Sequence, residues 1–145
     1  MMRLMRLTRL SVLSFILLGA AQTAGMTQTP SLPCHGAQRP KNVAELLFGR
    51  NIGNRLGVTE SAFARFLDRE VTPRFSDGLT TIDAVGEWRD RGNGGIVRER
   101  SKLVEIVLPG NTEDQARLDA IVAAYKRDFR QQAVGVIVRP ACVSF

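Results

Sequence analysis

Three carboxylates lie within segments in which apolar and polar residues alternate. Glu45 belongs to the short run VAELLFG, Asp83 to the segment that leads to Trp88, and Glu105 to the run that ends at Leu108. Because alternate residues of a strand point to opposite sides, we expect these three side chains on one face of a sheet. Crowding of Glu45 and Glu105 on neighbouring strands would raise the pKa of at least one of them, which suits a general acid or base.

The same face has a structural interpretation. A strand face that is half apolar and half charged is also typical of an outer surface, or of a dimer contact in which carboxylates pair with arginine. Arg139 is a candidate partner for such pairing. A homodimer formed through this open face would bury its apolar members and enclose a cavity. The residues therefore leave an acid–base site and a dimer interface as open alternatives.

A second set of polar residues gathers at predicted strand ends and in the loop after the first strand. If these residues converge at one end of the sheet, arginine forks there could hold the anionic group of a small ligand. The candidate ligand-binding residues are Arg50, Arg89, Arg98, Ser101 and Lys102, with Glu99 beside them.

Other chemistries lack the residues that they need. The only histidine is His35, which precedes the predicted domain, so the domain can build neither a Ser-His-acid triad nor a histidine-based metal site. The glycines of Gly92–Gly95 lack the lysine of a phosphate-binding loop and predict a hairpin turn instead. Basic residues are scattered among acidic ones and aromatic residues are few, which argues against nucleic-acid binding. We therefore expect no metal, no cofactor and no nucleic-acid partner.

Periodicity predicts four strands and two helices. A hydrophobic stripe that Thr59 caps and Pro73 stops indicates the first helix. A capping box of Thr112 with Gln115 indicates the start of the second helix. Pro140, within the last strand, favours an edge position for that strand. The predicted strands are Val43–Gly49, Leu79–Trp88, Ile96–Leu108 and Ala133–Phe145.

This order of elements, β-α-β-β-α-β, is the split β-α-β pattern of ferredoxin-like folds. We predict an α+β domain in which two helices pack on one face of a four-stranded antiparallel sheet, with the first and third strands as the central pair. Alternation places Ile82 and Trp88 under the helices. It leaves the open face to the three carboxylates and their apolar neighbours.

The first residues carry the features of an export signal. Three arginines precede an apolar run over 10–18, and small residues follow over 19–21. The run is too short to span a membrane, which takes about 20 apolar residues. We predict a cleavable signal peptide over 1–24, an extended tail over 25–42 and a single domain over 43–145. The mature protein is then secreted or periplasmic, with no stable membrane anchor.

Two cysteines are present, Cys34 before the domain and Cys142 close to the C-terminus. In an exported chain two cysteines favour a disulfide between them. The bond would close a loop of about 108 residues, which in the chain-entropy model stabilises a fold by roughly 4 to 5 kcal/mol. We therefore expect the tail to be fixed against the last strand.

Several short motifs occur in order along the predicted domain: ELLFGR at 45–50, VTPRF at 71–75, DGLT at 77–80, GEWR at 86–89 and RERSK at 98–102. In these motifs the chain resembles the bacterial secreted proteins of domain-of-unknown-function family 3574, over about residues 43–145. The resemblance implies a bacterial envelope or periplasmic setting and supplies no reaction. Many similar proteins resemble lipoproteins, whereas the first cysteine here lies well beyond the apolar run.

Two classes of function follow from these features. We expect an exported envelope protein whose domain binds a small anion or a protein partner without catalysis. The alternative is a cofactor-independent enzyme that uses carboxylate and arginine groups for acid–base chemistry in a dimer cavity.

Overall fold

The structure is a computed structural model and describes residues 33–90 and 92–145, so the predicted signal peptide lies outside the described residues. The elements are β1 (Arg39–Gly49), β2 (Asn51–Ile52), β3 (Arg55–Leu56), α1 (Glu60–Phe66), η1 (Leu67–Val71, a π-helical turn), β4 (Thr80–Arg89), β5 (Ile96–Val107), α2 (Asp114–Phe129) and β6 (Gly135–Val143).

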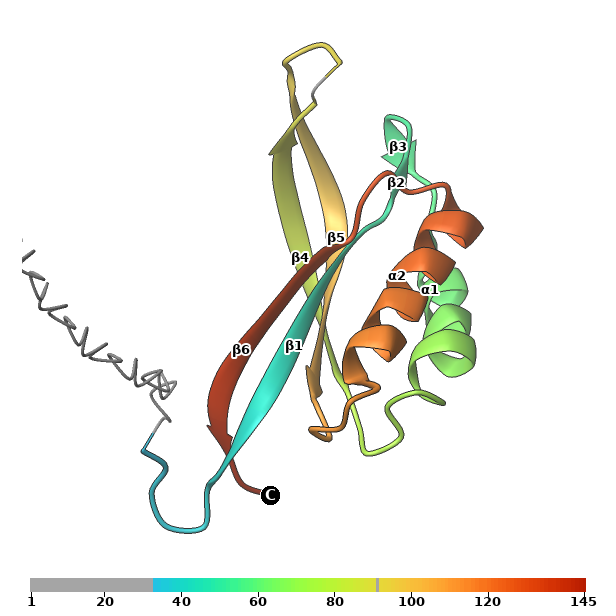
Figure 1. Ribbon diagram of the computed structural model, residues 1–145. Coiled ribbons are helices and arrows are strands. Elements are labelled where there is room, and N and C mark those ends of the chain that lie inside the picture. The colour runs from blue at the N-terminus through green and yellow to red at the C-terminus, as the bar shows by residue number, and fades with distance from the viewer. Residues whose placement is uncertain (1–32, 91) are drawn as a thin grey trace, which may run out of the picture. The chain divides into compact units, whose positions relative to one another are not determined.

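Four long strands form one antiparallel sheet in the order β4-β5-β1-β6, and β2 pairs with β3 in a short hairpin. The two helices lie on the same side of this sheet (Figure 1). The predicted ferredoxin-like α+β fold is therefore confirmed, with β1 and β5 as the central pair and β6 at the edge that Pro140 indicated.

The core lies between the helices and the two central strands. Every buried core residue that the sheet supplies belongs to β1 or β5. Phe48 of β1 packs its ring against those of Phe63, Phe66 and Tyr125, at centroid distances of 5.6, 5.8 and 4.6 Å. No residue of β4 or β6 is fully buried. The helices thus cover the middle of the sheet and leave the helix side of β4 open.

The start of the first helix is confirmed and the start of the second is not. Thr59 Oγ1 accepts a hydrogen bond from a main-chain N–H in the first turn of α1, as an N-cap residue does. Thr112 does not cap α2. Asp114, its first residue, instead accepts hydrogen bonds from the N–H groups of Gly110 and Asn111, at 2.8 and 3.1 Å. The loop before α2 is therefore held by the carboxylate of Asp114, which belongs to the helix itself.

The side-chain direction predicted for β4 is wrong. The register pairs Ile82 with Leu103 and Asp83 with Lys102, and Lys102 points toward α1. Asp83 therefore lies on the helix side, whereas Ile82 and Trp88 lie on the open face. Because the helices do not reach β4, neither of its sides is buried, and hydrophobic alternation does not determine which side faces the helices.

Cys34 and Cys142 form the predicted disulfide, with their Cα atoms 5.4 Å apart. The bond closes the end of the sheet where β1 pairs with β6, because Pro40 lies opposite Cys142 in the register. His35 is exposed beside it. In the described part of the chain, no helix is both long and apolar enough to cross a membrane.

Candidate functional site

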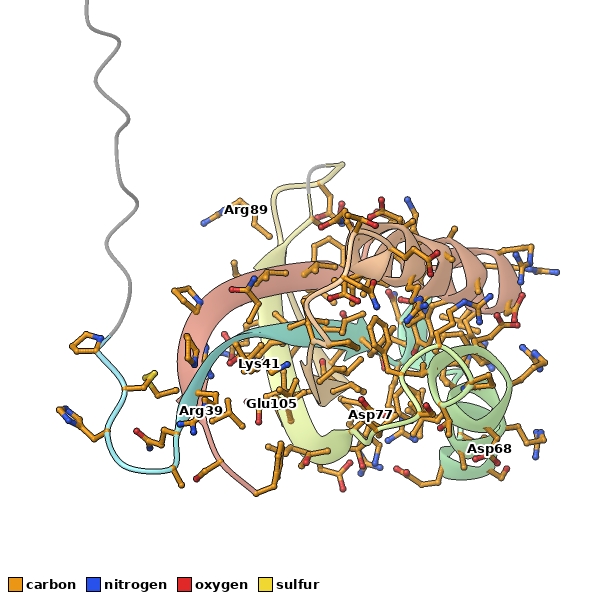
Figure 2. All side chains as sticks on the ribbon, turned by 60° about the horizontal axis from the view of Figure 1, so that its bottom comes forward. Arg39, Lys41, Asp68, Asp77, Arg89 and Glu105 are labelled. Atoms are coloured by element: carbon orange, nitrogen blue, oxygen red, sulfur yellow. A yellow bond between two sulfur atoms is a disulfide. The ribbon has the colours of Figure 1, made fainter. Side chains whose placement is uncertain are left out.

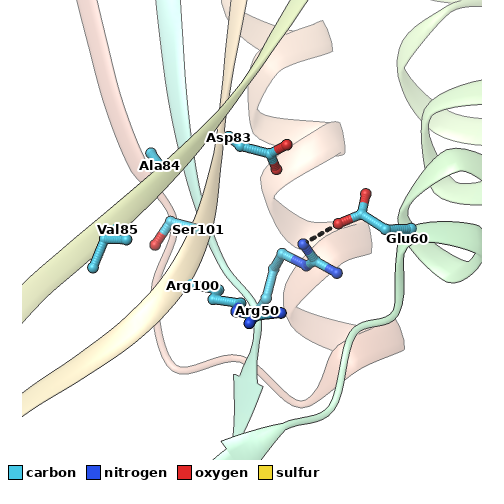
Figure 3. A pocket seen from close by; sticks show the side chains of 7 residues that line it. All are labelled: Arg50, Glu60, Asp83, Ala84, Val85, Arg100 and Ser101. Carbon is cyan, nitrogen blue, oxygen red and sulfur yellow. Dashed lines mark hydrogen bonds and ion pairs between the residues drawn. The ribbon is translucent and has the colours of Figure 1, made fainter.

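A hollow of about 400 Å³ lies on the helix side of the sheet, between β4 and the start of α1 (Figure 3). It exists because the helices cover the central strands and stop short of β4. Charged side chains of both signs line it. The lining residues are Arg50, Glu60, Asp83, Ala84, Val85, Arg100 and Ser101.

Arg50 is buried at the base of this hollow and is only 3% exposed. It directly follows β1, and its main-chain N–H donates to the carbonyl of Arg100 at 3.0 Å. Its side chain donates from Nε to the Val58 carbonyl at 2.9 Å and from Nη1 to Glu60 Oε1 at 2.5 Å. Main-chain and side-chain bonds together hold the guanidinium in place.

Lys102 of β5 is the second buried cation and is 8% exposed. Its Nζ lies 2.6 Å from Asp83 Oδ1, 2.8 Å from Glu60 Oε2 and 6.0 Å from the ring centroid of Phe63. Its hydrogen bonds to Asp83 and then to Glu60 raise the pKa of Lys102, and burial lowers it by less. Lys102 is therefore charged at neutral pH.

Glu60 joins the two buried cations. One carboxylate oxygen contacts Arg50 and the other contacts Lys102, and these hydrogen bonds, that of Lys102 first, lower the pKa of Glu60. The pKa of Asp83 is lowered chiefly by its own hydrogen bond to Lys102. Both carboxylates are largely exposed, whereas both cations are buried. Acidic groups thus form the mouth of the site and basic groups form its floor.

Arg100 adds a third positive charge. It is exposed, and it forms no ion pair with any residue over 33–90 and 92–145. The charges of Arg50 and Arg100 both contribute to the lowered pKa of Asp83, which places them within electrostatic reach of the mouth. The lining itself holds Arg50 and Arg100 against Glu60 and Asp83. Lys102, which contacts both carboxylates, brings the count to three cations against two carboxylates.

Part of the predicted anion-binding set meets at this hollow. Arg50 and Lys102 come together through Glu60. Ser101 borders the hollow, but its side chain lies on the open face of the sheet, away from Arg50 and Glu60 (Figure 3). Glu60 was not predicted from the sequence. An acidic residue in the first turn of a helix is already explained by the helix dipole, and only the packing of α1 against the sheet brings this one to two cations.

The rest of that set lies elsewhere. Arg98 pairs with Glu87 at 2.6 Å, and Arg89 Nη1 donates to the carbonyl of Gly94 at 2.8 Å. Both arginines belong to the hairpin arm of β4 and β5, which extends beyond the helices (Figure 1). Figure 2 shows Arg89 on this arm, away from the helices. The five candidates therefore do not converge on one site, because the strands that carry two of them run past the body of the domain.

Glu45 and Glu105 lie opposite each other on β1 and β5, as predicted. Arg139 of β6 binds Glu45 through Nε and Nη2, at 3.0 and 2.7 Å, and lies 3.6 Å from Glu105. An arginine thus bridges the two carboxylates, which is the arrangement of the structural interpretation. Asp83 does not join them, because it lies on the other side of the sheet.

Glu99 connects the hairpin arm to the body of the domain. Its two carboxylate oxygens accept hydrogen bonds from Trp88 Nε1 at 2.9 Å and from the Asn51 N–H at 3.1 Å. The carboxylate occupies the space of a Cβ at position 49, at 2.7 Å from its ideal place, so this approach requires Gly49. From the core, Tyr125 donates to the Gly49 carbonyl at 2.8 Å. Burial raises the pKa of Tyr125, which keeps its hydroxyl protonated.

Within residues 33–90 and 92–145, no group of three or more His, Cys, Asp or Glu side chains is placed to hold a metal ion. The arrangement at the hollow is suited to binding an anion. Arg50 and Lys102 are buried and fixed in position, whereas the carboxylates that pair with them lie at the surface.

Comparison with known proteins supplies a family and a fold. A protein-family model described as "Protein of unknown function (DUF3574)" matches residues 43–145. A search of curated proteins finds no significant match.

Similar solved structures include a phage SAM lyase in complex with S-methyl-5'-thioadenosine, with a TM-score of 0.58 and 18% identity over 81% of this chain and 97% of that chain. Phage SAM lyase in the apo state has a TM-score of 0.55 and 19% identity, over 78% of this chain and 90% of that chain. CutA from Synechococcus elongatus has a TM-score of 0.46 and 12% identity, over 74% of this chain and 80% of that chain. At these identities the likeness concerns the fold alone.

Proposed function

The chain belongs to the DUF3574 family, whose function is unknown, and we propose from its own geometry that it is an exported protein that binds a small anion. The site is the hollow at Arg50 and Lys102. Binding there is non-catalytic and needs no cofactor.

The observation that carries this proposal is the Glu60 carboxylate, each oxygen of which contacts one buried cation. A ligand carboxylate or phosphate presents the same pair of oxygens, so Glu60 marks the position that such a group takes. Arg50 and Lys102 are fixed by burial, whereas Glu60 is 67% exposed at the start of α1. In the proposed exchange, the Glu60 side chain turns toward solvent and the ligand anion takes its place. Exchange of one anion for another leaves both buried cations paired, which avoids the cost of an uncompensated charge.

Two further residues indicate the shape of the ligand. Arg100 has no ion pair in the described chain and is available for a second acceptor group. Val85 is largely exposed and supplies an apolar wall. A volume of about 400 Å³ falls within the range of small-molecule sites. A small organic acid or phosphate ester with an apolar body therefore fits better than a large polyanion.

Export is supported by two independent features. Residues 1–24 carry the charge and hydrophobicity pattern of a signal peptide. The disulfide between Cys34 and Cys142 persists in oxidising compartments, such as the bacterial periplasm or the extracellular space. A secreted or periplasmic location follows from both.

NMR titration of the mature, disulfide-bonded protein with inorganic phosphate and with acetate tests the proposal. We expect saturable shifts at the Nε–H of Arg50 and at the amides around Lys102 and Arg100. S-methyl-5'-thioadenosine, which the similar phage SAM lyase binds, serves as an uncharged comparator and should leave these signals unshifted.

A pair of variants locates the site. Arg100→Gln should weaken phosphate binding about two- to fivefold, because an exposed ion pair contributes at most about 1 kcal/mol. Arg127→Gln makes the same change in net charge on α2, where Arg127 pairs with Asp128, and should leave the affinity unchanged. Equal effects of the two variants, or shifts that never saturate, would contradict a site in this hollow.

The acid–base alternative receives less support from the geometry. Glu45 is bound by Arg139, and Asp83 lies on the opposite side of the sheet. The contacts of Glu45 with Arg139 are those of a structural ion pair, and the three carboxylates do not share one site.

A further inference from the structure

The face of the sheet opposite the helices carries exposed apolar side chains on all four strands. The register aligns Ile82, Leu103 and Leu47 across β4, β5 and β1. Leu47 extends over Gly135 of β6, whose missing side chain leaves room for it. The residues of this open-face patch are Leu47, Ile82, Trp88, Leu103 and Ile137, of which all but Leu103 are 40 to 48% exposed.

The centre of this patch is the row of branched side chains of Ile82, Leu103 and Leu47. The next residues on the same face are Ala84, Ser101 and Gly49, which are all small, and the Glu99 carboxylate lies over Gly49. The branched row is therefore the part of the face that a second copy would contact, and an isologous contact brings the same row of both copies together.

We propose that the open-face patch binds a second copy of this chain, with the two sheets packed face to face about a two-fold axis. Strands of nine or more residues, about 3.3 Å per residue and about 4.8 Å apart, give a four-stranded face of roughly 550 Å². Two copies then bury roughly 1,100 Å² in total, which reaches the ~1,000 Å² that a specific interface needs. Aligned packing of two sheets about 10 Å apart is an ordinary arrangement of such faces.

Charge favours a second copy over a membrane surface. The same face carries charges of both signs in equal number, namely Glu45, Glu99 and Glu105 with Arg39, Lys41 and Arg139. Attraction to anionic lipid headgroups takes a cluster of basic residues, which this balanced face does not offer. A second copy offers an arginine to each Glu105, whose distance of 3.6 Å from its own Arg139 is long for an ion pair.

The two proposals rest on different charged and apolar side chains, because the cations and carboxylates of the hollow lie on the helix side of the sheet. Only Ala84 and Ser101, whose side chains lie on the open face, border both surfaces. A failure of either proposal therefore leaves the other in place. Dimerisation would leave the hollow of each copy open to solvent.

Sedimentation velocity of the disulfide-bonded protein from the periplasm, from low micromolar to submillimolar concentration, tests the proposal. The wild type should form a dimer. Ile82→Lys should weaken dimerisation at least about 30-fold, the factor for the loss of a major interface residue. Ile96→Lys is the matched control, because Ile96 is 54% exposed on the helix side of the same hairpin, and it should dimerise like the wild type.

Ile137→Lys, on the opposite edge strand, repeats the test should Ile82→Lys fail to fold, and circular dichroism checks folding. A wild type that stays monomeric throughout, a trimer or larger assembly, or a dimer that both patch variants leave intact would overturn the proposal. A monomer that instead binds lipid vesicles would also overturn it.

Discussion

Glu60 interacts both with its own helix and with residues that are distant in the sequence. Its place in the first turn of α1 suits the positive end of the helix dipole. Its contacts with Arg50 and Lys102 are longer-range interactions, and they set the electrostatics of the hollow. Buried cations with an exposed carboxylate between them are stable as they stand and are ready for exchange with a dissolved anion.

The carboxylates of the hollow predict a loss of stability in acid. The pKa values of Glu60 and Asp83 are lowered in the folded protein by their hydrogen bonds to Lys102. Their contribution is therefore complete above the unfolded value of about 4, and it is lost as the pH falls through the lower folded values. Urea unfolding at pH 7, 5, 4 and 3 should show the decline below about pH 4.

Lys102→Gln removes the main cause of the lowered pKa values of Glu60 and Asp83. The variant should therefore lose less stability in acid than the wild type does. The pKa of Lys102 is raised, so its own contribution is present below its unfolded value of about 10.4 and is lost only at higher pH, through the raised folded value. At neutral pH the contributions of Lys102 and of the two carboxylates to stability are therefore all present. An acid decline of equal size in the variant and in the wild type would show that other groups cause it.

Gly49→Ala should detach Glu99 from its partners. The added Cβ would lie 2.7 Å from the carboxylate, and the side chain would have to leave the Asn51 N–H and the Trp88 indole. Loss of these bonds should lower the free energy of unfolding by about 1 to 3 kcal/mol.

The chain has a single tryptophan, so the fluorescence of Trp88 reports the change directly. Its emission should shift in Gly49→Ala. The control Gly53→Ala introduces a Cβ into open space, although at a positive φ of 64°, and should leave the emission unchanged. An unshifted emission in Gly49→Ala would show that Glu99 does not hold the indole.

Among the elements, those with one buried side were predictable and β4 was not. Helical periodicity and strand alternation locate α1, α2, β1 and β5, since each presents an apolar side to the core. Both sides of β4 are exposed, so the sequence does not indicate which of its side chains face the helices. The candidate site was for this reason the hardest part to predict, because Asp83 is brought to the start of α1 only by the register of β4 with β5.

The two predicted helix caps give a direct comparison. Thr59→Ala should lower the free energy of unfolding by about 1 kcal/mol, because Thr59 Oγ1 accepts a hydrogen bond in the first turn of α1. Thr112→Ala should change it by less than about 0.5 kcal/mol, because α2 begins at Asp114 and no side chain caps it from Thr112. Chemical denaturation measures both. A larger cost for Thr112→Ala than for Thr59→Ala would contradict the observed start of α2.

In the molecule as a whole, the sheet separates two working surfaces. The helix side holds the core and, at its open margin by β4, the charged hollow. The other side carries the open-face patch and the salt-bridged Glu45. The disulfide closes the far end of the sheet, where β1 and β6 pair.

The disulfide should contribute substantially to the stability of the whole domain. Cys34 and Cys142 are 108 residues apart in the sequence, so the bond constrains nearly the entire unfolded domain. The double variant Cys34→Ser/Cys142→Ser should lose about 2 to 5 kcal/mol in the free energy of unfolding. Urea unfolding under oxidising conditions measures the loss, and a variant as stable as the wild type would contradict it.

The most direct test of the account is the phosphate affinity of Glu60→Gln, measured by calorimetry beside Glu113→Gln. Glu113 pairs with Arg117 at the start of α2, so the second variant makes the same change in net charge away from the hollow. If Glu60 occupies the anion position, Glu60→Gln should bind phosphate at least about tenfold more tightly than the wild type, and Glu113→Gln should not. Unchanged or weaker binding in Glu60→Gln would contradict the central claim.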